Sequence, residues 1–106
     1  MKQNIKSIKI LGKTYSVEYL PYGHRNLIKN DKVCGGRIKT DLQQIYIEKG
    51  LAEETNTGIL LHECLHGLSN AMNIDLTENQ ALGLEEGLLA LLKDNPKLTK
   101  MFLKKG

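Results

Sequence analysis

The first half of the chain alternates apolar and polar positions in short runs, which is the pattern of half-buried β-strands. Ile8 and Ile10 alternate with polar neighbours, and Tyr15, Val17 and Tyr19 repeat the pattern after a turn at Gly12-Lys13. This spacing predicts a hairpin with one apolar face. Two further strands are predicted over residues 34–39 and 44–48, joined by a turn at Thr40-Asp41. The polar stretch 24–32 is ambiguous between a loop and a short helix, and its isolated His24 is expected at the surface.

The second half changes to helical spacing. Apolar residues recur at intervals of three and four over 53–72, with Asn73 as a plausible cap in the left-handed conformation. A second helix is predicted to begin after Asp75 or Thr77, where Thr77 and Gln80 have the spacing of a capping box. It ends at Asn95-Pro96, and a short last helix is predicted over 96–103. The apolar positions of the second helix predict a wide buried stripe. They are Ala81, Leu82, Leu84, Leu88, Leu89, Leu91 and Leu92.

Strands followed by helices predict an α+β fold, with a small antiparallel or mixed sheet of about four strands packed on the first helix and a second, C-terminal helix. With 106 residues there is room for one core. We therefore expect a single domain over 1–106, mainly β over 1–50 and mainly α over 51–106. A groove between the sheet edge and the first helix would accept an extended peptide as an added strand.

Composition narrows the function classes. Hydrophobic residues make up 41% of the chain, too many for a disordered protein, and the net charge is only +3. The lysines of the C-terminal tail lack interleaved aromatic residues, so direct nucleic-acid binding is not expected. No apolar run suggests a secretion signal or a membrane span, and two cysteines, Cys34 and Cys64, make no disulfide framework. The expectation is a cytoplasmic protein with free thiols.

The candidate chemistry lies in the first helix, where residues 62–66 read His-Glu-Cys-Leu-His. In this H-E-x-x-H motif, the side chains of His62 and His66 lie one turn apart on one helix face and can hold a single Zn²⁺. Glu63 can then act as general base toward a metal-activated water. Cys64 points away from the histidine pair and is expected to be packed. A chance match on an ordinary helix is the alternative.

A catalytic zinc usually has three protein ligands, so the two histidines need a partner. The chain has no histidine after His66, which leaves carboxylates as candidates: Asp75, Glu78, Glu85 and Glu86. Glu78 and Glu85 share a largely apolar helix face that should look toward the motif helix. A carboxylate in the first turn of a helix is also favoured by the dipole alone, so Glu78 needs no metal to explain it. A dedicated donor for the substrate oxyanion is not evident, although Arg37 or Tyr46 could serve.

From about Cys34 onward the chain resembles small zinc metallopeptidase-like proteins of phages and other mobile elements. These are akin to the ImmA/IrrE group of metallo-endopeptidases and to gluzincins generally. The residues that carry the resemblance are Gly35-Gly36-Arg37-Ile38, Gln44 to Ile47, Leu60 to His66, Leu76 to Ala81, Gly87-Leu88 and Asp94 to Pro96. The resemblance implies that Glu78, followed three residues later by Ala81, is the third zinc ligand. The gap of 12 residues from His66 to Glu78 is short, and the gap to Glu85 or Glu86 is nearer that of thermolysin-like enzymes.

These features together predict a zinc metalloendopeptidase with His62, His66 and Glu78 as ligands and Glu63 as catalytic base. Its partner would be a protein or peptide substrate, such as a repressor-type regulator. One alternative is a zinc-binding regulatory module of a phage or mobile element that binds such a regulator without cutting it. Another is a structural zinc that only staples a small core.

Overall fold

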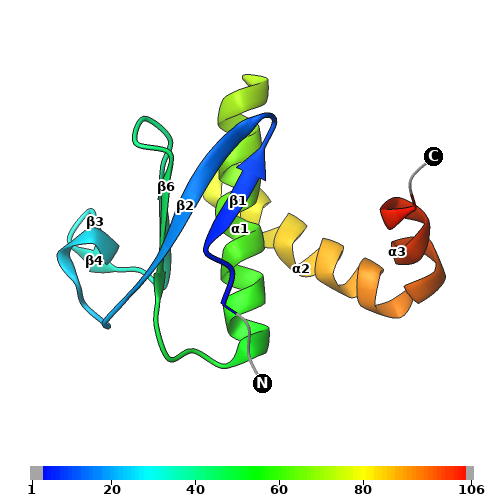
Figure 1. Cartoon of the computed structure of the whole chain (residues 1–106). Coiled ribbons are helices and arrows are strands. Elements are labelled where there is room, and N and C mark those ends of the chain that lie inside the picture. Colours follow the sequence, from blue (N-terminus) through cyan, green and yellow to red (C-terminus); the bar gives the residue numbers. More distant parts are fainter. Residues whose placement is uncertain (1–3, 105–106) are drawn as a thin grey trace.

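A mixed four-stranded sheet packs on one long helix in the computed structural model, which describes residues 4–104 (Figure 1). The sheet order is β1-β2-β6-β5, with β1–β2 and β5–β6 antiparallel and β2–β6 parallel. The predicted α+β class is confirmed, and all strands precede the α-helices. The bounds of the sheet strands are β1 Ser7–Ile10, β2 Lys13–Leu20, β5 Gly36–Lys39 and β6 Gln44–Glu48.

The central strand β6 is buried on both faces. Ile45 and Ile47 are fully buried and pack in one cluster with β1, β2 and Leu60 of the long helix. Tyr46 points to the opposite face, where it packs with Leu20 and Leu27. Successive side chains of a strand point to opposite faces, so three apolar residues in a row are typical of a strand that is covered on both faces. The sheet is therefore a layer between the helix and the chain segment that contains Leu27.

That segment is more ordered than the sequence predicts. It forms a single 3₁₀ turn, η1 (Arg25–Leu27), and a small hairpin of β3 (Ile28–Lys29) and β4 (Lys32–Val33). Strands of two residues are too short to show alternation, which is why the hairpin was missed. The expectation of a surface His24 was wrong in detail: His24 is half-buried, and its ring Nδ1 accepts a hydrogen bond from the Asn26 N–H at 3.0 Å.

The hairpin also shortens the third predicted strand. Cys34 N–H donates to the Leu27 carbonyl at 2.7 Å rather than to the sheet, and β5 begins only at Gly36. β5 is an edge strand, since it pairs with β6 on one side only. It runs beside the long helix, α1 (Glu53–Met72), and this placement decides where the groove lies.

Three helices follow the sheet: α1, α2 (Glu78–Asp94) and α3 (Pro96–Leu103). Their ends are those that the sequence predicts. Asn73 closes α1 in the left-handed conformation, with φ of 60°, and Thr77 and Gln80 make the predicted reciprocal capping box at the start of α2. Pro96 occupies the first turn of α3. None of the helices within the described residues is long and apolar enough to cross a membrane.

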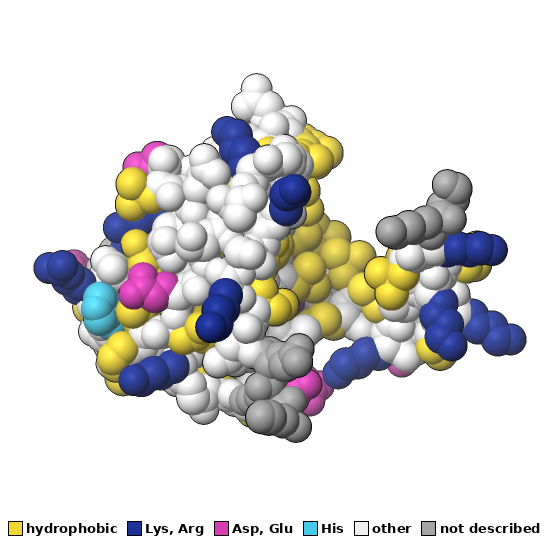
Figure 2. Space-filling view, viewed as in Figure 1, with side chains coloured by type: hydrophobic (Ala, Val, Ile, Leu, Met, Phe, Trp, Pro, Cys, Tyr) yellow, Lys and Arg dark blue, Asp and Glu magenta, His cyan; other side chains and the backbone are white. Residues whose placement is uncertain are grey.

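The predicted wide buried stripe of α2 was wrong. Ala81 is the only α2 residue that is buried, whereas Leu82, Leu84 and Leu91 are 48%, 44% and 45% exposed. The reason is that α2 packs mainly against α1 and α3, so a single narrow face is covered. Figure 1 shows α2 and α3 extending from the sheet and α1 as an arm, and Figure 2 shows apolar side chains gathered over α2 and the adjoining flank of α3.

Candidate metal centre

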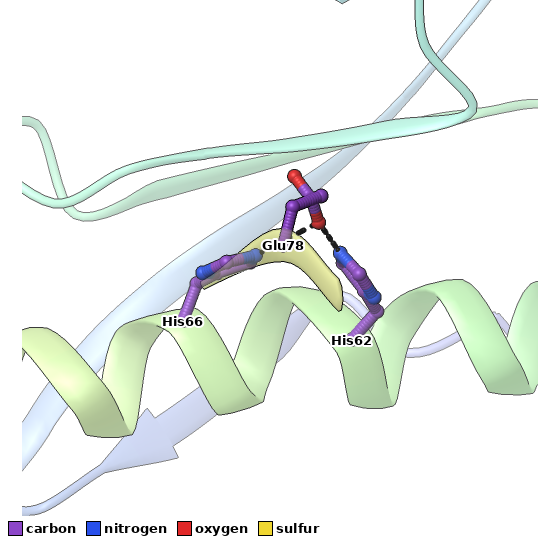
Figure 3. Close-up of side chains that lie close together, drawn as sticks. All are labelled: His62, His66 and Glu78. Atoms are coloured by element: carbon purple, nitrogen blue, oxygen red, sulfur yellow. Dashed lines mark hydrogen bonds and ion pairs between the residues drawn. The ribbon is translucent and has the colours of Figure 1, made fainter. Parts of the chain in front are cut away.

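His62 and His66 lie one turn apart on α1 and face the start of α2. Their rings are in edge contact, with centroids 4.9 Å apart. Glu78, the first residue of α2, brings its Oε1 atom to the Nε2 atoms of both histidines; the distance to His66 is 3.1 Å, and His62 is in direct contact as well (Figure 3). One ligand atom from each residue lies within 4.8 Å of the other two. The structure thus brings together the three residues that the sequence and the resemblance selected.

A short, well-fixed turn delivers Glu78 to this point. After Asn73 turns the chain, the Ser69 hydroxyl donates to the carbonyl of Ile74, and the Thr77 capping box starts the next helix. The cap satisfies backbone N–H groups that otherwise have no partner at a helix N-terminus. The connection over residues 73–77 is therefore long enough to place a carboxylate from α2 over the histidine pair on α1. The short gap after His66 is no obstacle.

Glu85 approaches His62 from the other side of the ring. Its Oε1 lies 3.1 Å from His62 Nδ1, while Glu78 contacts Nε2, so the two carboxylates occupy opposite nitrogens of one imidazole. In a metal-loaded site, a carboxylate at Nδ1 would keep the proton there and leave the Nε2 lone pair to the metal. Glu85 thus contacts the His62 nitrogen that Glu78 does not, and it is not a member of the three-residue group that could hold a metal. The other two candidates, Asp75 and Glu86, do not belong to the group of converging ligand atoms found among the described residues.

Gly58 makes room for Glu85. A Cβ atom at Gly58 would lie 2.7 Å from Glu85 Oε2, so a side chain there would push the carboxylate away from His62. The sequence contains a signal for this contact, because a glycine inside a helix costs about 1 kcal/mol relative to alanine and often marks a close approach of another side chain. Gly58 and His62 are one turn apart on α1, which is the spacing that lets one α2 side chain touch both.

Glu63 is the only buried charged residue among those described, with 7% of its surface exposed. It sits under β5, where a Cβ atom at Gly36 would come within 3.3 Å of Glu63 Oε2 and 2.4 Å of the Ile59 side chain. Burial raises the pKa of the Glu63 carboxyl, and the opposing charges of His62, His66 and Lys29 only partly offset that effect. The glycine in β5 thus permits the strand to cover a carboxylate without displacing it.

The Glu78 carboxyl has the opposite behaviour. Partial burial alone would raise its pKa, but hydrogen bonds with His66 and His62, together with their charges, outweigh burial and lower the pKa below its usual range. The two imidazoles therefore favour the ionised form of Glu78, which is the form in which a carboxylate binds a metal. The pKa values of the two carboxyl groups shift in opposite directions because Glu63 is enclosed, whereas Glu78 faces two imidazoles.

The triad opens into a groove along β5 that has two halves. One half is a cavity of about 280 Å³ that His62 enters, with Cys34, Gly35 and Ile59 in its wall. The other is a cavity of about 230 Å³ that His66 enters, and its wall includes Lys29, Arg37 and Asn70. Gly36, Glu63 and Glu78 line both halves, so the candidate chemistry lies where the two halves meet.

The two residues expected as oxyanion donors lie in different surroundings. Tyr46 is buried with Leu20 and Leu27 on the far face of the sheet, so it cannot reach a substrate in the groove. Arg37 does line the groove, but its Nη1 donates to the Ile28 carbonyl at 2.9 Å and ties the hairpin to β5. Both cysteines are free. Cys34 borders the groove, and Cys64 packs against the core cluster, as expected.

Comparison with known proteins adds nothing to this geometry: no protein-family model, curated protein or solved structure matches the chain. The fold, and a histidine-histidine-glutamate group that can hold a metal ion, are therefore established on the chain's own residues.

Proposed function

We propose that this protein is a zinc-dependent peptidase that uses Glu63 as its general base. The observation that carries the proposal is the position of a buried carboxylate between a convergent metal-ligand triad and an edge strand. Glu63 and Glu78 line both halves of the same open groove, beside His62 and His66. A metal that only tied two helices together would need neither the groove nor a second carboxylate with a raised pKa.

The donor set fits zinc. Two imidazole nitrogens and one carboxylate oxygen are the ligands of thermolysin-type catalytic zinc sites, which keep a fourth position open. When bound, such a metal lowers the pKa of a water molecule toward about 7 and polarises a carbonyl. His62, His66 and Glu78 would hold it, and Glu85 would keep His62 in the required tautomer.

Glu63 would move the proton. Peptide hydrolysis adds water across the C–N bond, so one proton must travel from the attacking water to the leaving amine. A carboxylate whose pKa is raised above its usual range accepts a proton more readily than an ordinary one and can then return it. Because β5 covers Glu63 on one side, the carboxylate is kept away from bulk water and directed toward the groove.

The edge strand would hold the substrate. β5 pairs with β6 on one side only, and Gly36 and Ile38 of β5 line the groove. An unpaired strand edge can accept an extended peptide through backbone hydrogen bonds. A protein segment that is already extended, such as a linker in a repressor-type regulator, would fit better than a folded surface.

Exposure argues against a purely structural zinc. Structural sites are enclosed by four protein ligands. Here the Glu78 side chain is 70% exposed, and the group identified among residues 4–104 has three members. A ligand that faces solvent beside two cavities leaves space for water and substrate.

The test is hydrolysis by the zinc-loaded protein compared with its Glu63→Gln variant. Zinc per chain is measured by elemental mass spectrometry, and cleavage of unfolded casein is followed by mass spectrometry of the products. We expect about one zinc in both proteins, as for one three-ligand site, and a rate about 10²- to 10⁴-fold lower in the variant. Equal cleavage by both proteins would rule out Glu63 as the base.

A zinc-binding module without peptidase activity is the second candidate. It is favoured by the placement of the two expected oxyanion donors, since Tyr46 lies on the far face of the sheet and Arg37 is bonded to the Ile28 carbonyl. It predicts zinc in both proteins and cleavage by neither. Absence of zinc from freshly purified protein, even after incubation with zinc, would reject both candidates.

A further inference from the structure

Resting on the peptidase function proposed above, we infer that the groove selects substrates with an acidic side chain next to the scissile bond. The inference comes from the difference between the two halves of the groove. Glu63 and Glu78 line both halves. Apart from them and Glu85, the half entered by His62 is lined by small or apolar residues, whereas the half entered by His66 adds Lys29, Arg37, Thr40 and Asn70. We call these the apolar half and the basic half.

The charges of the groove do not cancel. In the loaded site, the Glu63 and Glu78 carboxylates together balance the two positive charges of a divalent ion. In the apolar half the remaining carboxylate is Glu85, which is engaged with His62 Nδ1. In the basic half, Glu63 and Glu78 are the acids already counted against the ion, so Lys29 and Arg37 would have no further acid to balance them among the residues that line it. An anionic group from the substrate would complete that half.

Lys29 is the residue that can make the contact. It lies in β3 at the mouth of the groove, its side chain is exposed, and its charge is one of those that act on the Glu63 carboxylate. A long flexible ammonium can follow a carboxylate on a bound peptide. Arg37 has a supporting role, because its bond to the Ile28 carbonyl holds the hairpin, and with it Lys29, against β5.

The size of the basic half suits one side chain. A cavity of about 230 Å³ takes an aspartate or glutamate together with water, and the Thr40 and Asn70 side chains border it. Because His66 enters this half and Glu63 lines both, the acidic residue would lie within one or two positions of the bond that is cut. The opposite flank of the bond would carry a residue that suits the apolar half, beside Ile59.

The hairpin provides a matched control. Lys32 is the cross-strand partner of Lys29 in the β3–β4 hairpin, is also exposed, and does not line either half of the groove. Charge reversal at Lys29 and at Lys32 changes the net charge of the protein identically. Only reversal at Lys29 changes the groove.

The experiment measures binding and cleavage separately. Binding is measured by fluorescence anisotropy on the zinc-loaded Glu63→Gln protein, with three labelled pools of random decapeptides that carry Glu, Gln or Lys at one fixed central position. We expect the Glu pool to bind roughly five to ten times more tightly than the Lys pool, the range that exposed ion pairs and their reversal give at low salt. Adding Lys29→Glu should abolish or invert that preference, and adding Lys32→Glu should leave it.

Cleavage is measured with zinc-loaded wild type on a mixed peptide library, with product ends read by mass spectrometry. Enrichment of Asp or Glu beside the cut that is lost in Lys29→Glu supports the inference. Cleavage without such enrichment, equal binding of the three pools, or equal effects of Lys29→Glu and Lys32→Glu would overturn it. Acid-selective binding that depends on Lys29, without any cleavage, would uphold the acid selectivity of the basic half and reject the peptidase function.

Discussion

The sheet with α1 and the arm made by α2 and α3 use the same apolar residue types with opposite results. In the sheet and α1, Ile45, Ile47 and Leu60 are 7% exposed or less, in a core that α1 and the strands enclose. In the arm, comparable leucines remain 44–48% exposed, and Ala81 alone is buried. The contrast shows that an apolar stripe is buried only where a second layer covers it. The candidate site lies at the junction of the two regions, where Glu78 and Glu85 of α2 contact the histidines of α1.

The largest expected effect distinguishes the two regions by stability. Ile47→Ala removes a fully buried side chain of the central strand and should lower the free energy of unfolding by about 2–5 kcal/mol. Leu91→Ala, at a position of α2 that is 45% exposed, should change it by within about 0.5 kcal/mol. Urea unfolding followed by circular dichroism measures both. Similar losses in the two variants would mean that the arm is packed as firmly as the core.

Metal should join the arm to the rest of the molecule at its first turns. Since His62 and His66 come from α1 and Glu78 from α2, zinc at 100 times its dissociation constant should stabilise the folded state by about 2.7 kcal/mol. Hydrogen exchange should slow in α1 and the start of α2 but hardly in α3. The double variant His62→Ala/His66→Ala is the control and should show no response to zinc. Uniform slowing of exchange through α3 would contradict the division of the molecule into the sheet with α1 and a separate arm.

The contact from Glu85 to His62 should tune metal affinity. Glu85→Gln weakens the acceptor at His62 Nδ1 and should reduce zinc affinity about 10- to 100-fold, as for other carboxylates behind a ligating histidine. Glu86→Gln, at the exposed neighbouring position, is the matched control and should leave the affinity unchanged. Competition with a chromophoric chelator measures both variants. The same affinity in both would reduce Glu85 to a packing residue.

The smallest effect concerns the far end of the junction, where Lys93 of α2 meets Glu54 of α1 with Nζ 2.9 Å from Oε1. The hydrogen bond from Lys93, aided by its charge, lowers the pKa of the Glu54 carboxyl. A lowered folded-state pKa stabilises the fold at neutral pH, and that contribution is lost as the pH falls through the acid range. We therefore expect Glu54→Gln to melt slightly below wild type at pH 7 and level with it at pH 3. A difference that persists at pH 3 would point to another cause.

Much of the fold could be predicted because its signals are local. The bounds of α1, the capping box at Thr77 and the left-handed Asn73 follow from side chains a few residues apart. The hairpin at 28–33 and the exposure of α2 were not predictable in this way. The first is too short to show a period, and the second depends on which layers lie beside a helix.

Residue order alone identifies the candidate metal ligands: two histidines one turn apart, with a glutamate between them, and a carboxylate placed at the start of the next helix by its cap. Which imidazole nitrogen each carboxylate contacts, in contrast, depends on the tertiary structure. Glu78 and Glu85 are two turns apart on one face of α2, and sequence spacing allows either to serve as a ligand. Only the packing of α2 on α1, with Gly58 at the crossing, sets Glu78 at Nε2 and Glu85 at Nδ1 of His62. The physical reason is that periodicity specifies a helix face, whereas the nitrogen that a carboxylate meets depends on the distance between two helices.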